Sequence, residues 1–412
     1  MSKYNKYLQK EFSNLPYNLY QIIEEYLFLN RNIKIAFVGG FLRDLLIKKI
    51  HKINSIKTID LDIVIEGSAL SLANFIKNKI KNVSLCLIKE YEVYNTVELN
   101  IENLKLDIAS ARKETYFAPG HNPNVTDTII EEDLIRRDFT INAIAYEISN
   151  KRILDLFDGI SHIEQKLVHL LHENSIKDDP SRLLRCAKYT TRFGFHMSQS
   201  SLNQAQEFIK EWPWVATPQN GGLKFPPGIS IRIRMELSEI IKYDNLSKII
   251  SELDKWDCLS ILNKDIIVDK KFIRGINWIK RIKGQEILYL LKNSKSLNIL
   301  AKRLFLNSKQ IKIILDYQDT KKILGIDKRN FINFSASDWT EFIEGRNLDP
   351  ETVKLIISDS EEFWRSFFKW LYIFRFIKSK KSGSELKEEG WEPGYLMGAE
   401  IKRLRYQEID RL

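Results

Sequence analysis

The sequence predicts an α+β protein in which a mixed-sheet head precedes an elongated, all-helical neck, body and tail. Between residues 33 and 155, short β-branched and apolar runs alternate with helical segments, as in a sheet packed against helices. Beyond residue 160, most segments carry a helical apolar period and contain little Gly or Pro. Because 412 residues exceed one ordinary core, we expect roughly two to four domains.

The head is expected to open with a strand at 33–38 that leads through Gly39 and Gly40 into an apolar-periodic helix. Later segments are predicted from apolar periodicity, except for one stretch that contains two prolines and a glycine and reads as a loop. In order, they are a strand at 58–66, a helix at 68–80, strands at 84–91, 93–100 and 104–110, the loop at 112–128, a helix at 133–148 and a closing segment at 152–159.

Composition narrows the class of protein. Lys and Arg outnumber Asp and Glu by 64 to 54, and the net charge of +10 suits a polyanionic partner. Basic clusters with interleaved aromatic residues recur in the helical part, although solvated helix faces are the simpler interpretation of each. Cys86, Cys186 and Cys258 form no CxxC pair, which favours a reducing compartment. The polar N-terminus and the lack of a bilayer-spanning apolar run predict a soluble, cytoplasmic protein with no membrane role.

Two aspartates follow each other at alternate positions of the strand TIDLDIVIE. Residues two apart in a strand share a face, so Asp60 and Asp62 project together while the apolar residues point into a core. Such a like-charge pair is costly unless a cation lies between the carboxylates, and Mg²⁺ prefers oxygen ligands of this kind. Asp107 on a neighbouring strand candidate could supply a third carboxylate or could be an edge residue. An exposed acidic pair without function is the alternative.

The paired glycines come directly after the first strand of the head. Gly39 and Gly40 allow backbone N–H groups to approach a phosphate closely at the positive end of the following helix. Arg43 would add a fixed cation that faces a triphosphate. The alternative is an ordinary strand-to-helix turn with a surface salt bridge.

The stretch RRDFTINA (136–143) is the next dense polar patch, predicted to start a helix. Asn142 follows Asp138 by four residues, so the two share a helix face. Arg137 could contact phosphates, while Asp138 and Asn142 could bind ribose hydroxyls and so prefer NTP over dNTP. A capped helix with surface arginines is the alternative.

A polar stripe is predicted along the helix that follows DDP. Asp179, Arg182, Arg185 and Lys188 are spaced three apart and therefore lie on one face. A carboxylate can accept from the exocyclic amine of cytosine or adenine while a guanidinium donates to the adjacent ring nitrogen. Uracil and guanine present the reverse pattern, so such a pair could select C and A without a nucleic-acid template. A surface salt bridge is the alternative.

Together these motifs resemble the class II tRNA nucleotidyltransferase and poly(A) polymerase family. The matching stretches occur in the family's order over about residues 35–196. They are FVGGFLRDLL with DLD downstream, ASARKETY, EEDLIRRDFTINAIAYE, LFDGISHIEQKLV and DDPSRLLRCAKYTTRFGF. Each motif is short, but the ordered set is highly specific.

The resemblance implies a template-independent enzyme that adds or repairs the 3′-terminal CCA of tRNA, with CTP and ATP as substrates and Mg²⁺ as cofactor. Asp60 and Asp62 would bind the metal, and residues 112–127 would form a flexible element that switches selection from C to A. Asp179 and Arg182 would select the base, and Arg185 and Lys188 would hold the triphosphate. The remaining nucleotide contacts that it implies are Gly40, Arg43 and Arg137.

The resemblance also implies a division of the chain and leaves some departures. We expect a helical extension at 1–32, the nucleotidyltransferase head at 33–160, a neck with the nucleotide-selecting helix at 161–228 and an RNA-binding body and tail at 229–412, with no stable protein partner. The family often has Glu at the position of Asp178 and Arg at that of Lys188, so nucleotide affinity could differ.

Three other functions fit the same motifs. A poly(A) polymerase shares nearly all of them, and an enzyme that adds only the terminal A is a further alternative. The retained segment from ARKETY to RRDF argues against an enzyme that adds only CC. A non-catalytic RNA-binding protein is less consistent with Asp60 and Asp62, because carboxylates with no metal to bind repel each other.

Overall fold

The computed structural model describes residues 2–53, 60–80, 86–102, 104–116, 122–212, 227–242, 246–326 and 328–412. The chain forms two compact units, Met1–Glu236 and Leu237–Leu412. The four-part division expected from the sequence stays a prediction. No helix in these ranges is long and apolar enough to cross a membrane.

The first unit is built on a seven-stranded sheet with the strand order β3-β4-β5-β2-β1-β8-β9. β2 and β5 are parallel, and the other neighbouring strands are antiparallel. The mixed sheet predicted for the head is therefore confirmed. Its strands are β1 (Ile35–Val38), β2 (Asp60–Ile65), β3 (Cys86–Tyr91), β4 (Thr96–Ile101), β5 (Leu104–Ser110), β8 (Ile144–Glu147) and β9 (Arg152–Asp155).

β1 lies inside this sheet and is buried on both faces. On one face, Phe37 stacks on Phe12 of α1 (Ser2–Ser13), with the ring centroids 4.4 Å apart. On the other face, Val38 belongs to an apolar cluster that includes Leu134. Burial on both faces explains why the strand reads as the continuous apolar run IAFV rather than as an alternating pattern. The strand that carries the paired glycines at its end is thus firmly packed.

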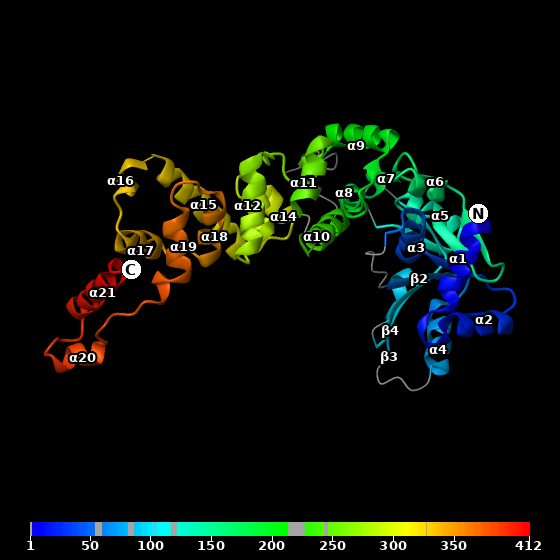
Figure 1. The fold of residues 1–412 in the computed structure, drawn as a ribbon, viewed down its shortest axis with the longest axis horizontal. Coiled ribbons are helices and arrows are strands. Elements are labelled where there is room, and N and C mark those ends of the chain that lie inside the picture. Colours follow the sequence, from blue (N-terminus) through cyan, green and yellow to red (C-terminus); the bar gives the residue numbers. More distant parts are fainter. Residues whose placement is uncertain are drawn as a thin grey trace. The chain divides into compact units, whose positions relative to one another are not determined.

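Helices cover the sheet (Figure 1). α3 (Gly39–His51) begins where β1 ends and packs on β1, β2 and β8, while α4 (Ala69–Lys79) packs on β3, β4 and β5. α2 (Leu19–Leu29) packs in turn on α4. At the start of α4, the Ser68 hydroxyl accepts the Ser71 N–H, which satisfies one of the free donors of the first turn.

The helix predicted at 133–148 is wrong. The segment instead forms the end of α5 (Ile130–Ile135), a 3-10 turn η3 (Thr140–Asn142) and the strand β8. β8 pairs with β1 on one side and β9 on the other, and all four of its residues are buried. An apolar run buried on both faces has no strand alternation, so periodicity does not distinguish it from a buried helix.

The loop predicted at 112–128 is also wrong at both ends. β6 (Arg112–Thr115) and β7 (Asn124–Asp127) pair as an antiparallel ribbon, with Arg112 opposite Asp127. Residues 117–121 lie outside the described residues. The ribbon was missed because Pro and Gly between its strands dominate the local signal, although RKET and NVTD contain β-branched residues.

Small helices complete the first unit after β9. A two-stranded parallel ribbon, β10 (Leu167–Val168) with β11 (His196–Met197), packs on α8 (Ser181–Phe193), the helix of the predicted polar stripe. Residues 213–226, in the last part of the neck expected at 161–228, lie outside the described residues. The helices are α6 (Gly159–Glu164), α7 (Ser175–Asp178), α8 (Ser181–Phe193), α9 (Gln199–Glu211) and α10 (Pro227–Lys242), the last of which continues into the second unit.

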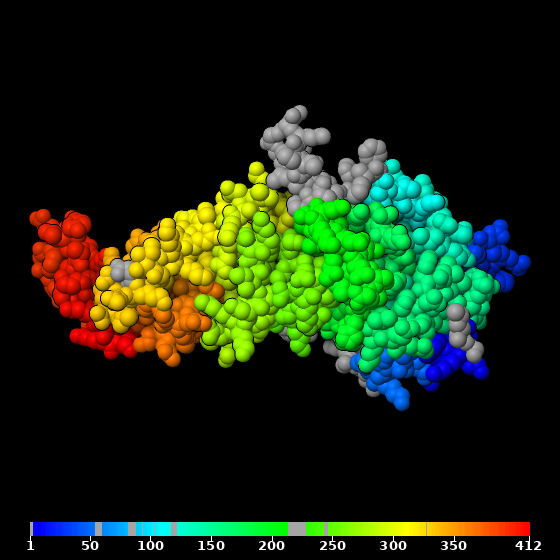
Figure 2. All heavy atoms as spheres, turned by 90° about the horizontal axis from the view of Figure 1, so that it is seen from above, coloured from blue at the N-terminus to red at the C-terminus, as the bar shows by residue number. Residues whose placement is uncertain are grey.

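The described part of the second unit is helical, which confirms the predicted helical remainder. On the face seen in Figure 2, atoms of successive helices of this unit lie against one another. Its core holds a buried ion pair, in which the Lys292 ammonium lies 3.2 Å from the Asp359 carboxylate. The helices are α11 (Leu246–Lys255), α12 (Lys270–Arg281), α13 (Glu286–Leu291), α14 (Leu297–Arg303), α15 (Ser308–Ile326), α16 (Lys328–Ile332), α17 (Ala336–Gly345), α18 (Pro350–Asp359), α19 (Trp364–Tyr372), α20 (Gly383–Glu388) and α21 (Tyr395–Asp410).

Candidate active site

The junction of β1 and α3 is the centre of the candidate site. Gly39 has a φ of +67°, and a Cβ there would lie 2.6 Å from Asp62 Oδ2 and 3.3 Å from an Arg137 guanidinium nitrogen. Only glycine fits this position without strain or a clash. The next residue, Gly40, donates its N–H to Asp62 Oδ2 at 2.9 Å. The structure thus brings together both predicted glycines, one predicted metal ligand and one predicted phosphate-binding arginine.

The three predicted carboxylates lie on adjacent parallel strands. Asp62 of β2 is in register with Asp107 of β5, and Asp60 is two residues earlier on β2 at an exposed position. Burial is the main cause of a raised pKa at Asp62, and the charge of Asp107 raises this pKa further, whereas Arg137 and the Gly40 N–H lower it. The ionised form of Asp62 is therefore destabilised by its surroundings, and a cation beside it would relieve this cost.

The donor set of this corner suits a hard divalent cation. No group of three His, Cys, Asp or Glu residues gathers as metal ligands in the described part of the chain. Mg²⁺ does not need one, because it is commonly bound by one or two carboxylates together with substrate phosphates and water. Asp60 and Asp62, on one face of β2, provide such a pair. Asp107 is engaged instead by Lys105, whose ammonium lies 3.0 Å from its carboxylate.

The Arg43 side chain is almost completely buried rather than part of a surface salt bridge. Its guanidinium donates to Asp44 at 2.8 Å and to Asn142 Oδ1 at 2.7 Å, and it lies 4.7 Å from the centre of the Tyr189 ring. It also lies close to Gly40, since a Cβ there would be 3.4 Å from Arg43 Nη2. Arg43 therefore links the glycine corner to η3 and α8.

The shared helix face predicted for Asp138 and Asn142 is wrong, because the segment forms η3, but the two side chains are in contact. Asn142 Nδ2 donates to Asp138 Oδ1 at 2.8 Å, and the other Asp138 oxygen lies 2.9 Å from Arg185 of α8. Burial alone would raise the pKa of Asp138, but the charge of Arg185 and the bond from Asn142 lower it. These contacts favour the ionised form of Asp138, which joins the head to α8.

The members of the predicted α8 stripe bind different partners. Asp179 accepts the Ser181 N–H at 3.1 Å just before the helix, and it also lies 3.1 Å from the guanidinium of Arg232. Arg182 is 6% exposed and donates to Ser175 Oγ at 2.7 Å and to the Arg136 carbonyl at 3.0 Å. The orientation of Arg182 is therefore fixed by groups outside its own helix.

Further along α8, one carboxylate serves two of the predicted triphosphate-binding residues. Glu236 of α10 lies 3.0 Å from the Lys188 ammonium and 3.5 Å from the Arg185 guanidinium. Sequence reasoning missed Glu236, because no local pattern connects α10 to α8. The cations predicted to bind phosphates are thus partly neutralised by the protein itself.

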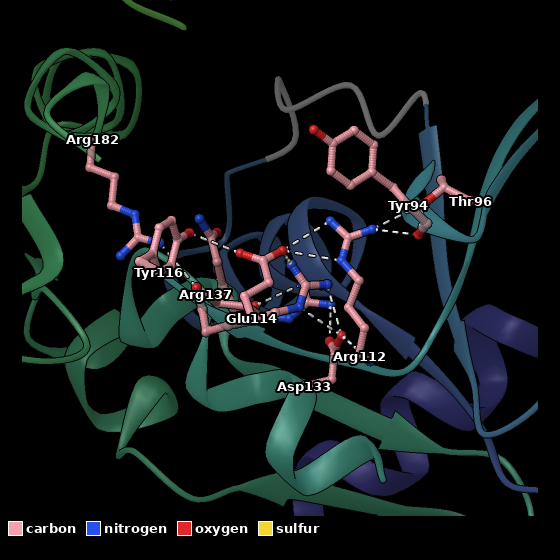
Figure 3. A network of polar contacts seen from close by, with 10 residues as sticks. Tyr94, Thr96, Arg112, Glu114, Tyr116, Asp133, Arg137 and Arg182 are labelled. Carbon is pink, nitrogen blue, oxygen red and sulfur yellow. Dashed lines mark hydrogen bonds and ion pairs between the residues drawn. The ribbon is translucent and has the colours of Figure 1, made fainter. Parts of the chain in front are cut away.

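Sequence analysis also did not predict the network of ion pairs and hydrogen bonds at the base of the β6–β7 ribbon (Figure 3). Glu114 lies 3.1 Å from Arg112 and 3.0 Å from Arg136, and its other oxygen accepts the Tyr116 hydroxyl at 2.9 Å. The ring of Tyr116 lies beside Arg182. The ribbon therefore reaches Arg182, the residue of α8 that the sequence predicts to select the base.

The chain is similar to known nucleotidyltransferases over its head. Residues 35–169 match the family model described as the poly A polymerase head domain. The chain is 35% identical over 189 residues to the A-adding tRNA nucleotidyltransferase of Aquifex aeolicus (44% of this chain, 22% of that protein) and 37% identical over 177 residues to that of Halalkalibacterium halodurans (42% and 39%). The chain thus spans less than half the length of these curated relatives.

Other similarities extend over nearly the whole chain at lower identity. The CCA-adding enzyme of Pediococcus pentosaceus is 23% identical over 91% of this chain and 89% of its own length. A CCA-adding enzyme in its apo form II superposes with a TM-score of 0.75 at 23% identity, over 96% of this chain and 92% of that chain. A Thermotoga maritima CCA-adding enzyme complexed with tRNA superposes with a TM-score of 0.71 at 22% identity (96% and 91%). The fold is shared with these structures.

Proposed function

We propose that this chain belongs to the class II tRNA nucleotidyltransferase and poly(A) polymerase family, whose head-domain model matches residues 35–169, and that it adds or repairs the 3′-terminal CCA of tRNA from CTP and ATP. The observation that carries the proposal is the hydrogen bond between the Gly40 N–H and Asp62, in a corner that also holds Arg137. Glycine backbone, carboxylate and guanidinium together form a site for a metal-bound triphosphate.

Mg²⁺ is the proposed cofactor, and Asp60 and Asp62 would hold it. When bound, the metal lowers the cost of deprotonating the tRNA 3′-hydroxyl and neutralises charge on the departing pyrophosphate. The chain's own groups bind and orient the nucleotide. Gly39 and Gly40 present their backbone to the phosphates, and Arg137, one guanidinium nitrogen of which lies near Gly39, provides the cation.

Base selection is assigned to Asp179 and Arg182 at the start of α8. The carboxylate would accept the amine of cytosine or adenine, and the guanidinium would donate to the neighbouring ring nitrogen. Uracil and guanine would leave these groups unpaired, which costs binding energy in a buried site. Support comes from the fixed orientation of Arg182, which the Ser175 hydroxyl and the Arg136 carbonyl hold in place.

An enzyme that adds only the terminal A is the second candidate. It is favoured by the two relatives that match the head at 35% and 37% identity, both named A-adding tRNA nucleotidyltransferases. The β6–β7 ribbon is compatible with either activity, because both require selection of ATP.

Three synthetic tRNAs that end before CCA, after C and after CC distinguish these functions. Each is incubated with the purified chain, Mg²⁺ and CTP, ATP or both, and products are resolved at single-nucleotide resolution. Ordered addition of C, C and A followed by arrest supports the CCA-adding enzyme. Extension of only the CC-ended tRNA by one A supports the A-adding enzyme. Long A tracts on unrelated RNA indicate a poly(A) polymerase, and no incorporation at all would refute the proposal.

A further inference from the structure

Asp133 of α5 has no exposed surface and accepts hydrogen bonds from three arginine residues (Figure 3). Its Oδ1 accepts from the Arg136 guanidinium at 2.9 and 2.7 Å and from the Arg112 backbone N–H at 3.2 Å. Its Oδ2 accepts from Arg137 Nη2 at 3.1 Å. One carboxylate thus connects the ribbon strand β6, the end of α5 and the glycine corner.

Arg137 and Arg136, which both bind Asp133, contact different parts of the candidate site. Arg137 directs its other terminal nitrogen toward the glycine corner, 3.3 Å from where a Cβ of Gly39 would lie. Arg136 is held by its side chain at Asp133, and its carbonyl accepts from Arg182 at 3.0 Å. Asp133 therefore supports both Arg137, the proposed phosphate-binding residue, and Arg182, the proposed base-selecting residue.

The charge of Asp133 is maintained by these partners. Burial alone would raise the pKa of this carboxyl, but the charges of Arg137 and Arg136 lower it below its usual value. A buried carboxylate without such partners would be very costly, so the arrangement of the arginines and the ionisation of Asp133 depend on each other. Planar guanidinium groups bound to a fixed carboxylate are also restricted in direction, which a neutral residue would not achieve.

We propose that Asp133 is a positioning residue for nucleotidyl transfer, which orients Arg137 toward the triphosphate and holds the main chain that fixes Arg182. This proposal rests on the proposed function. Asp133 touches neither substrate nor metal, and it acts through the two arginines. Misplacement of a binding group by about 1 Å can reduce a rate about a hundredfold, so we expect the loss of Asp133 to be visible in turnover.

The test uses the full chain with Asp133→Asn, which keeps the shape and removes the charge, and Glu132→Gln as a matched control on the same helix. We expect Asp133→Asn to reduce kcat for A addition to a CC-ended tRNA by about tenfold to a hundredfold, with partial rescue in Asp133→Glu. Incorporation of UTP relative to CTP should rise, while tRNA binding stays the same. Glu132→Gln should match the wild type.

A double-mutant cycle with Arg137→Lys separates positioning from general stability. If Asp133 acts through Arg137, adding Asp133→Asn to Arg137→Lys costs less kcat/KM than adding it to the wild type, whereas a purely structural role gives additive losses. Additive losses, or wild-type kcat and selectivity in folded Asp133→Asn, would overturn the proposal. If Asp133→Asn does not fold, the cycle is run with Asp133→Glu and decided in the same way. Absence of incorporation by the wild type in the same assay would instead refute the proposed function.

Discussion

The carboxylate of Glu236 lies 3.0 Å from the ammonium of Lys188, so a cation expected to bind a triphosphate is already paired within the protein. An incoming nucleotide must compete with Glu236 for Lys188 and Arg185. We therefore expect Glu236→Gln to lower the KM for CTP and ATP by about two- to fivefold, the range for a partly exposed ion pair. The control is Glu239→Gln, which removes a surface pair with Lys242 on the same helix. A higher KM would mean that Glu236 orients the two cations instead of competing for them.

The paired aspartates of β2 should be needed for chemistry but not for folding. Asp60→Asn with Asp62→Asn is expected to reduce nucleotide incorporation at least about a thousandfold and to leave tRNA binding nearly unchanged. Because burial and Asp107 destabilise the ionised form of Asp62, the melting temperature without divalent cations should not fall. Incorporation and thermal unfolding are measured on the same preparations, and normal turnover would refute the metal assignment.

Substitutions at two glycines with the same backbone conformation distinguish the effect of backbone strain from that of a steric clash. Gly39 and Gly194 have φ values of +67° and +66°, but only Gly39 has neighbours within 4 Å of an added Cβ. Gly194→Ala should cost about 1 kcal/mol and leave activity intact. Gly39→Ala should displace Asp62 and reduce kcat at least about tenfold. Urea unfolding and single-turnover rates for both variants check this, and equal activities would contradict the close packing described at Gly39.

Removal of Arg182 should affect nucleotide choice more than RNA affinity. Arg182→Ala takes away the guanidinium assigned to the base, and it also frees Ser175 and the Arg136 carbonyl. We expect the preference for CTP and ATP over UTP and GTP to fall by about tenfold to a hundredfold, with tRNA binding within about twofold. Continued exclusion of UTP and GTP in competition assays would show that other residues select the base.

The buried carboxylate of Asp359 should contribute to the loss of stability of the second unit in acid. Burial alone would raise the pKa of Asp359, but Lys292, Lys321 and Tyr317 lower it to about 2. A carboxyl whose pKa is depressed in the folded state stabilises the fold above its unfolded value near 4, and this contribution is lost as pH falls toward 2. Asp359→Asn should therefore destabilise the protein by about 3 kcal/mol at pH 7. It should also flatten the fall in stability between about pH 4 and pH 2. Unfolding curves across this range test both effects.

The sequence predicted the β1–α3 corner well because its signals are local. Paired glycines after an apolar strand and alternating aspartates each depend on residues a few positions apart. β8 was mistaken for a helix because burial on both of its faces hides strand alternation.

The partners that orient the site residues were harder to predict. Glu236 reaches α8 from a distant helix, and no spacing rule connects them. Asp133 lies three and four residues before Arg136 and Arg137, a spacing typical of helical ion pairs. The sequence therefore contained enough information to predict these contacts.

The strand order of the sheet has a consequence for synthesis of the chain. β1 pairs with β2 on one edge, but its other edge is covered only by β8, whose residues come more than a hundred positions later. Until Tyr146 emerges from the ribosome, the nascent head carries an unpaired and strongly apolar strand edge, the kind of surface that recruits chaperones or promotes aggregation. The corner that carries Gly39 and Gly40 can be completed only after this late strand has docked.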